Sequence, residues 1–373
     1  MAKIILVSRC AWTLYNFRSG LIRHLADKEK QQVIGAGAGG DGYEGKVEAL
    51  GIPFVPLPVD KRGVNPRSDL KLLWALIQFY RRERPDSVHH FTIKPVIYGS
   101  LAAKLCGVPR IVNTVTGLGY VFTGNRSSLL LRVVRLQYRC ALACAHTVFF
   151  QNKEDLAAFV TQRLVRADKA RLLAGSGVDT GHFAPNRSPA SPEQSEKLVF
   201  LMPARLLRDK GIYEFVEAAR AVKAEYPDTR FQLMGTRDER NPTVVSATQL
   251  ADWQASGVIE YLGHVDDVRL PLSEADVVVL PSYREGLPRS LLEAAAMAKP
   301  LITTDTVGCH DVVMDGVNGL LVPIQDHISL ALAMRRMIEN PVMRREMGAA
   351  GREKVVHEFN EASVIEAVVQ AYA

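Results

Sequence analysis

The chain lacks an apolar run that could cross a bilayer: no stretch of about 18 uncharged apolar residues occurs among its 373 residues. The apolar stretch after Met1-Ala2-Lys3 is also too short for the core of a signal peptide. Its five cysteines are odd in number and scattered, and Cys140 with Cys144 fits no zinc pattern. We therefore expect a cytoplasmic protein with reduced thiols and no metal site.

Acidic residues are scarce in the first half of the chain. Residues 1–185 contain 26 Lys/Arg and 13 Asp/Glu, a net charge of +13, whereas residues 186–373 contain 20 and 27, a net charge of −7. A basic half implies an anionic partner, such as a membrane surface, a phosphorylated acceptor or nucleic acid. The aromatic spacing of RNA-binding or cold-shock modules is missing, so we do not expect a nucleic-acid partner.

The length of the chain predicts two domains. Residues 186–197, which are rich in Pro, Ser and charged residues, read as a linker. Strands and helices alternate on both sides of it. The sequence therefore predicts an α/β protein with a first domain at residues 1–185 and a second at residues 198–357.

The most informative stretch runs from Pro281 to Pro323. A buried parallel strand at 276–280 should end at Pro281, and Glu285-Gly286-Leu287-Pro288 should turn into a helix. Pro288 suits the first helical turn, where a missing N–H costs nothing. Free backbone N–H groups and the helix dipole at such a helix start favour an anion.

Two carboxylates belong to the same stretch. Glu285 lies in the turn, and Glu293 follows eight residues later, just over one turn inside the helix. Both could face one cavity with room for a nucleotide between them. A phosphate at the helix start and acidic side chains for hydroxyl groups together suggest a sugar nucleotide.

This stretch resembles the E-x7-E motif of retaining glycosyltransferases of family 4, which have the GT-B fold. The matching residues are Glu285-Gly286-Leu287-Pro288, Glu293 and Asn318-Gly319-Leu320-Leu321-Val322-Pro323. The resemblance implies two Rossmann-like domains that face each other across a cleft. It also implies that a C-terminal segment, residues 358–373, returns to the N-terminal domain. We expect the first domain to bind the acceptor and the second to bind the nucleotide sugar.

The resemblance assigns Arg205 and Lys210 to the donor site. Because no Asp-x-Asp pair occurs to hold a divalent ion, these cations would neutralise the leaving diphosphate without a metal. The backbone N–H groups of Leu287 and Arg289 would assist them. Glu285 and Gly286 would hold the sugar and Glu293 the ribose. The remaining nucleotide contacts are expected from Gly235, Pro288 and Val265, the last of these at the base.

The first half supplies weaker candidates. We expect a loop over residues 8–19, and Arg18 and Gly20 near it are possible phosphate ligands. His90 ends a strand predicted at 87–91 and could bind acceptor or donor. A second strand, 110–115, leads into the acceptor candidates, which are Thr116, Gly117 and Gly119.

An alternative function rests on the run Gly35–Gly40, which fits G-x-G-x-x-G and has Asp60 about 20 residues further on. This pattern suggests an NAD-dependent dehydrogenase. The dehydrogenase motif, however, follows the first strand and opens a helix at once. Here it follows the second strand, so we interpret it as a flexible loop.

A helix predicted over residues 127–145 carries Arg132, Arg135 and Arg139 on one side. Such a basic amphipathic helix can rest on anionic lipids, or it can simply pack on the sheet with a solvated arginine stripe. With the +13 charge of its half-chain, the helix favours peripheral contact with the inner face of the bacterial plasma membrane.

Within family 4, several strings resemble enzymes that add N-acetylgalactosamine to undecaprenyl-diphosphate-linked sugars. These strings are Asn16-Phe17-Arg18, His89-His90-Phe91, Lys94-Pro95 and Thr116-Gly117-Leu118-Gly119. The resemblance implies a UDP-linked donor, no other cofactor and a polyprenyl-diphosphate acceptor. A lipopolysaccharide or capsule hexosyltransferase and a non-enzymatic nucleotide sensor are the alternatives.

Overall fold

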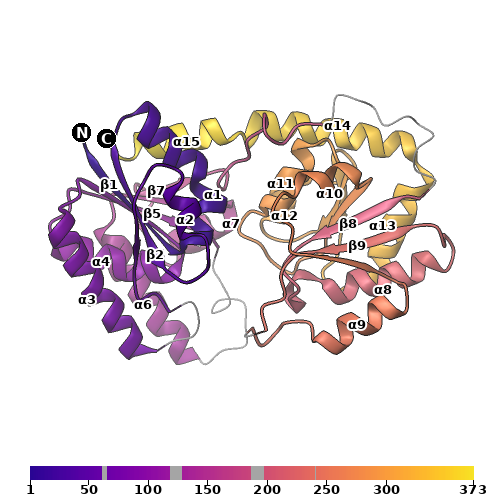
Figure 1. Cartoon of the computed structure of the whole chain (residues 1–373), viewed down its shortest axis with the longest axis horizontal. Helices are drawn as coiled ribbons and strands as arrows, with labels where there is room; N and C mark the ends of the chain where they lie inside the picture. The colour runs from indigo at the N-terminus through magenta and orange to yellow at the C-terminus, as the bar shows by residue number, and fades with distance from the viewer. Residues whose placement is uncertain (61–64, 118–127, 186–196, 240) are drawn as a thin grey trace. The chain divides into compact units, whose positions relative to one another are not determined.

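The computed structural model describes residues 1–60, 65–117, 128–185, 197–239 and 241–373 (Figure 1). They form two compact units, Met1–Ser176 with Glu361–Ala373, and Gly177–Asn360. The first unit thus ends at Ser176, before the predicted boundary at Pro185, and the returning segment begins at Glu361, not at residue 358. Residues 186–196 of the predicted linker lie outside the described residues.

The first unit is built on a seven-stranded parallel sheet of order β3-β2-β1-β4-β5-β6-β7. Because the strand order reverses between β1 and β4, the loops after these two strands border a topological switch point. The strands are β1 (Lys3–Cys10), β2 (Gln32–Ala38), β3 (Phe54–Pro56), β4 (Ser87–Phe91), β5 (Arg110–Val115), β6 (Thr147–Phe150) and β7 (Ala170–Leu172).

Helices cover both faces of this sheet, with a separate hydrophobic core on each face. One core is closed by α3 (Pro66–Glu83), α4 (Ser100–Leu105), α6 (Ser128–Cys144), α7 (Lys153–Thr161) and the π-helical segment η2 (Pro95–Gly99). The other is closed by α1 (Ala11–Arg23), the π-helical segment η1 (His24–Lys28), α2 (Glu44–Glu48) and α15 (Glu361–Gln370). In Figure 1, α15 lies beside α1, which shows how the chain's last helix completes the first unit.

Local signals set the bounds of α3. The Asn65 side chain accepts a hydrogen bond from the backbone N–H of Arg67, and Pro66 takes the first helical position. Arg84 ends the helix in the left-handed conformation, with φ of 48°. Between these ends the apolar side chains recur at helical spacing, and Leu72 and Leu76 are fully buried against the sheet.

The second unit has a six-stranded parallel sheet of order β10-β9-β8-β11-β12-β13. Its switch point lies between β8 and β11. The strands are β8 (Val199–Pro203), β9 (Arg230–Met234), β10 (Glu260–Gly263), β11 (Val277–Leu280), β12 (Leu301–Thr304) and β13 (Gly319–Val322). The helices are η3 (Arg208–Lys210, 3-10), α8 (Ile212–Lys223), α9 (Ala247–Ala255), α10 (Arg269–Glu274), α11 (Arg289–Ala296), α12 (Cys309–Val312), α13 (His327–Glu339) and α14 (Pro341–Glu358).

The predicted loop over residues 8–19 is wrong. Strand β1 runs to Cys10 and α1 begins at Ala11, so strand and helix follow each other directly. Thr13 makes this junction possible because its hydroxyl donates to the Cys10 carbonyl and is hydrogen-bonded to Ser8 Oγ, 2.7 Å away in both cases.

The interpretation of Gly35–Gly40 as a flexible loop is also wrong for most of its length. Strand β2 continues to Ala38, and Gly35 is paired with Phe54 of β3. A Cβ at Gly37 would lie 2.7 Å from the Ser8 carbonyl oxygen, so glycine permits the close approach of β1. This run does not open a helix, as a dinucleotide-binding motif would.

Among the described residues, no helix combines the length and the apolar character needed to span a membrane.

Candidate active site

The site is built from loops at the carboxyl edge of the second unit's sheet, beginning with the loop from β8 to α8. This loop carries Arg205 and Lys210 and ends at Gly211, whose φ is +76°. A Cβ at Gly211 would overlap the carbonyl oxygen of Pro281, the first residue after β11. Glycine therefore lets the two switch-point loops touch, and the Tyr283 N–H donates to the Asp209 carbonyl at 2.9 Å.

The two loops are also joined by an ion pair. Lys210 Nζ lies 2.5 Å from Glu285 Oε1, and the two side chains are only 13% and 16% exposed. The Arg205 guanidinium on the same loop is exposed, and no hydrogen bond or ion pair holds it to another described residue. Lys210 is therefore a positioned cation, while Arg205 can turn toward an anion.

A third loop, from β12 to α12, packs against the backbone of Glu285 and Gly286. Gly308 has φ of +83°, and a Cβ there would lie 2.7 Å from the Glu285 carbonyl oxygen and 2.8 Å from that of Gly286. The Glu285 N–H donates to the Val307 carbonyl at 3.1 Å. Thr306 Oγ1 donates to the Tyr283 carbonyl at 2.9 Å. The turn before α11 is thus held on two sides.

Helix α11 begins at this turn. Pro288 is its N-cap, in an extended conformation with ψ of 105°, and so precedes the helix; the prediction that Pro288 lies in the first turn is wrong by one residue. Pro288 makes no side-chain hydrogen bond to the helix, and the backbone N–H groups of the first turn point toward this end. With the dipole, these groups favour an anion next to Lys210.

Glu293 lies on α11, one turn after Arg289. Its Oε1 accepts from Arg289 Nε at 2.8 Å, and its side chain is 15% exposed. Burial raises the pKa of Glu293, and the Arg289 guanidinium acts in the opposite direction. Both glutamates of the motif are therefore largely buried and paired with a cation that itself lies near the helix start.

The remaining predicted donor contacts lie along the same sheet edge. Gly235 follows β9, and its N–H donates to the Gly263 carbonyl at 2.8 Å. A Cβ there would overlap the Ala204 carbonyl, so Gly235 packs directly on the Arg205 loop. Val265 follows β10 and is half-buried. The fold thus brings the predicted donor residues of the second unit onto the loops at this sheet edge and the first turns of α11.

One contact at this site is not predicted by any sequence pattern. Tyr283 donates from its hydroxyl to Glu214 Oε1 of α8 at 2.7 Å. Burial, followed by the nearby Glu214 carboxylate, raises the pKa of Tyr283 to about 12, so the phenol stays protonated. This bond ties the Glu285 turn to α8. Tyr283 and Glu214 are 69 residues apart, and no spacing pattern connects them.

Two family models match the chain in succession. Residues 3–152 match the model described as glycosyl transferase 4-like, and residues 184–354 match the one described as glycosyl transferases group 1. The chain belongs to glycosyltransferase family 4.

This glycosyltransferase is similar to curated enzymes along most of its length. It is 28% identical, over 92% of the chain and 91% of the relative, to the N,N'-diacetylbacillosaminyl-diphospho-undecaprenol alpha-1,3-N-acetylgalactosaminyltransferase of Campylobacter jejuni. It is 27% identical, over 85% of the chain and 82% of the relative, to the UDP-Gal:alpha-D-GlcNAc-diphosphoundecaprenol alpha-1,3-galactosyltransferase of Escherichia coli.

Solved structures show that the glycosyltransferase has the predicted GT-B fold of two Rossmann-like units. Anabaena Alr3699/HepE in complex with UDP-glucose matches with a TM-score of 0.79 at 16% identity, over 99% of both chains. The sucrose-phosphate synthase of Thermosynechococcus elongatus also has a TM-score of 0.79, at 19% identity, over 100% of this chain and 98% of that one.

His90 of the glycosyltransferase does not face a ligand site. Its ring is fully buried, with Nδ1 2.9 Å from Asn113 Oδ1 and Nε2 2.9 Å from the Tyr80 hydroxyl. Burial lowers the pKa of His90 to about 4, against a smaller opposing effect of Asn113, so the ring is neutral. Both nitrogens are used inside the core, and the structure thus contradicts the predicted catalytic or acceptor role.

The predicted phosphate ligands in α1 have different surroundings. The carboxylate of Glu361 fills the place where a Cβ would stand at Gly20, so this glycine packs against α15 and does not face a phosphate. Arg18 is buried, and its guanidinium lies 4.2 Å from the centre of the Phe91 ring, at the end of β4. The Arg18 guanidinium therefore lies at the topological switch point of the first unit, between β1 and β4.

The acceptor candidates follow β5. Thr116 and Gly117 are half-buried directly after the strand, and Gly117 has φ of +126°. Gly119 lies outside the described residues. The roles of Thr116 and Gly117 stay predictions.

Proposed function

We propose that this glycosyltransferase moves an N-acetylhexosamine, first of all N-acetylgalactosamine, from a UDP-sugar to a polyprenyl-diphosphate-linked saccharide. The Campylobacter relative supports both the sugar and the acceptor class, because its name states an N-acetylgalactosaminyltransferase acting on an undecaprenol-diphosphate-linked sugar. The reaction would serve the assembly of a bacterial surface or glycoprotein glycan at the inner face of the plasma membrane.

One observation carries the donor part of this proposal: the Lys210–Glu285 pair lies beside the start of α11, the positive end of the helix dipole. In the proposed complex the diphosphate binds between Lys210, Arg205 and the N–H groups of Leu287 and Arg289. Negative charge grows on the diphosphate as the sugar leaves, and preorganised positive groups stabilise that charge. Glu285 and Gly286 then hold the sugar.

The nucleoside binds on the other side of the diphosphate. Glu293 accepts hydrogen bonds from the ribose hydroxyls, and the loops at Gly235 and Val265 border the base. The matching Anabaena structures, which are complexes with UDP or UDP-glucose, support a uridine nucleotide.

The acceptor binds on the first unit, near Thr116 and Gly117, with Arg18 as a further cation at the switch point. His90 has no part in this proposal. Because the acceptor hydroxyl and the leaving phosphate act on the same face of the sugar, the configuration at the anomeric carbon is retained. We propose that the reaction needs no metal ion, since cationic side chains and the helix start supply the positive charge. Turnover should then be unchanged by a chelator such as EDTA.

The test is activity of the purified protein on a panel of UDP-sugars with defined lipid-diphosphate saccharides. We expect transfer from UDP-N-acetylgalactosamine, with an α-linked product identified by its proton coupling constant. Transfer from UDP-galactose alone would favour the second candidate, a hexosyltransferase, which the Escherichia coli relative supports. The proposal would be contradicted if the protein neither hydrolysed nor transferred a sugar from any nucleotide sugar of the panel.

A further inference from the structure

We propose that the outer faces of α3 and α6 form the surface by which the first unit rests on an anionic bilayer. The inference rests on the proposed function, because a polyprenyl-linked acceptor lies in a membrane. We call this surface the α3/α6 face. It consists of the exposed side chains Arg67, Leu70, Lys71, Trp74, Arg81 and Arg82 of α3 and Arg132, Val133, Leu136 and Arg139 of α6.

On α3 the exposed side chains form one continuous stripe, because with the exposed Gln78 between Trp74 and Arg81 they recur every three or four residues. Leu70 and Trp74 lie at its middle and are 65% and 64% exposed. Cations flank them at both ends of the helix. A tryptophan among leucine and basic side chains is typical of helices that lie at a membrane interface.

Helix α6 repeats the arrangement. Leu136 is 62% exposed, and Val133 lies one turn before it. Arg132 and Arg139 are exposed on either side, whereas Arg135, predicted to share this face, is half-buried. Ser128–Cys144 contains no acidic residue. The structure therefore leaves two of the three predicted arginines on the outer face and adds two apolar side chains between them.

The two helices present their stripes on the same side of the unit. Both close the same hydrophobic core on one face of the sheet, and α4 packs between them. Helix α4 continues the pattern, with Lys104 and Leu105 exposed. Of the two acidic residues in α3, Asp69 is buried beside Lys94 and does not offset the cations of the face. Glu83 is paired with both Lys3 and Arg82, so it offsets Arg82 and leaves Arg67, Lys71 and Arg81 as the cations of α3.

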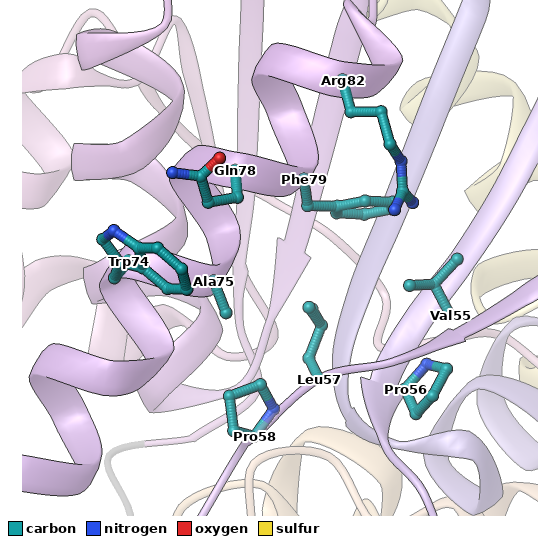
Figure 2. Close-up of a pocket in the computed structure, with 9 residues that line it drawn as sticks. All are labelled: Val55, Pro56, Leu57, Pro58, Trp74, Ala75, Gln78, Phe79 and Arg82. Atoms are coloured by element: carbon teal, nitrogen blue, oxygen red, sulfur yellow. The ribbon is translucent and has the colours of Figure 1, made fainter.

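A groove lies beside Trp74 on the α3/α6 face (Figure 2). It has a volume of about 550 Å³ and lies between α3 and the segment Val55–Pro58 at the edge of the sheet. Its walls are mainly apolar, with Leu57 and Phe79 among the lining residues, and Arg82 is the cation at its rim. The groove could receive apolar lipid segments next to the point where Trp74 enters the interface.

The charge of the face selects its partner. A second copy that met the chain through the same face would bring like charges together, which disfavours a symmetric dimer at this face. An anionic bilayer instead supplies negative headgroups for the cations and an apolar acyl-chain region for Trp74, Leu70 and Leu136. Each Lys or Arg near such a surface strengthens binding by about fivefold, an attraction that falls with salt.

The test is flotation of the full-length protein with vesicles of phosphatidylcholine, with and without phosphatidylglycerol. We expect binding only to the anionic vesicles, weaker at high salt. Replacing Trp74→Glu together with Leu136→Glu should abolish flotation, and Lys71→Ala with Arg81→Ala should weaken it by about 25-fold. The matched control is Leu332→Glu, which changes a side chain that is 58% exposed on α13 of the second unit and should bind as the wild type does.

A second measurement separates this inference from the proposed function. Turnover with a short-chain, water-soluble acceptor should be the same in the wild type and in Trp74→Glu/Leu136→Glu, which also shows that the variant is folded. Equal flotation of wild type and variant would overturn the inference, as would dimerisation of the wild type that this variant abolishes. Absence of turnover in the wild type would instead contradict the proposed function. Flotation would still test the membrane contact, because it does not depend on turnover.

Discussion

Replacing Lys210 with methionine tests the role of the ion pair at the donor site. Methionine keeps much of the apolar stem of lysine but removes the charge that lies 2.5 Å from Glu285. If this cation stabilises the departing diphosphate, turnover should fall by about 100-fold or more, as when one preorganised charge stabiliser is removed.

The same substitution leaves the Glu285 carboxylate, only 16% exposed, without its partner. An unsatisfied, largely buried acceptor costs about 1–3 kcal/mol, so Lys210→Met should lower the free energy of unfolding by that amount. The double variant Lys210→Met/Glu285→Gln removes both charges and should recover at least part of this loss. Its turnover should stay as low as that of the single variant.

The assay compares wild type, both single variants and the double variant in urea unfolding and in single-turnover transfer at saturating UDP-sugar. The coupling free energy between the two positions then comes from stability, and the chemical role comes from the rate. Unchanged turnover in Lys210→Met would refute the reasoning, even if stability changed as expected.

Three further predictions follow from the geometry. Glu293→Gln should weaken UDP binding about tenfold in calorimetry, because hydrogen bonds to a charged acceptor are the stronger ones; equal affinity would argue against the ribose contact. Gly211→Ala should lower the free energy of unfolding by at least about 2 kcal/mol, and by more than Gly257→Ala, where the φ is also positive but no atom lies within 4 Å of the added Cβ. His90 binds its proton in the unfolded chain near pH 6.5 but in the folded chain only near pH 4, so its stabilising effect is full above pH 6.5 and is lost as the pH falls to about 4. The pH dependence of urea unfolding in this window should be less steep in His90→Gln, and an identical slope would show that another group titrates there.

The sequence predicts the strand, turn and helix around Glu285 well because the relevant signals are local. Pro281 directly follows β11, and Pro288 directly precedes α11, so the turn that carries Glu285 is bounded by residues with fixed backbone preferences. Switch-point topology then places the Lys210 loop next to it. The pairing of Lys210 with Glu285 cannot be predicted from the spacing of the two residues in the sequence. It depends on Gly211 and Gly308, which let their loops pack closely against the segment Pro281–Gly286.

The first unit shows where local signals mislead. Glycine is depleted in strands, so Gly35–Gly40 suggests a loop. In the structure, Gly35 and Gly37 belong to β2, and neighbouring segments pack so closely against both positions that little room is left for a side chain. His90 does lie in the strand 87–91, as predicted. Its burial comes from Tyr80 on α3 and from Gly99, where a Cβ would overlap the His90 ring. No pattern in residues 87–92 could reveal those neighbours.

The central claim is that the donor diphosphate binds between Lys210 and the start of α11. A crystal structure of the protein with UDP tests it most directly. We expect phosphate oxygens within about 3 Å of Lys210 Nζ and of the Arg289 backbone N–H. UDP bound with its phosphates on the first unit, or away from α11, would contradict the account.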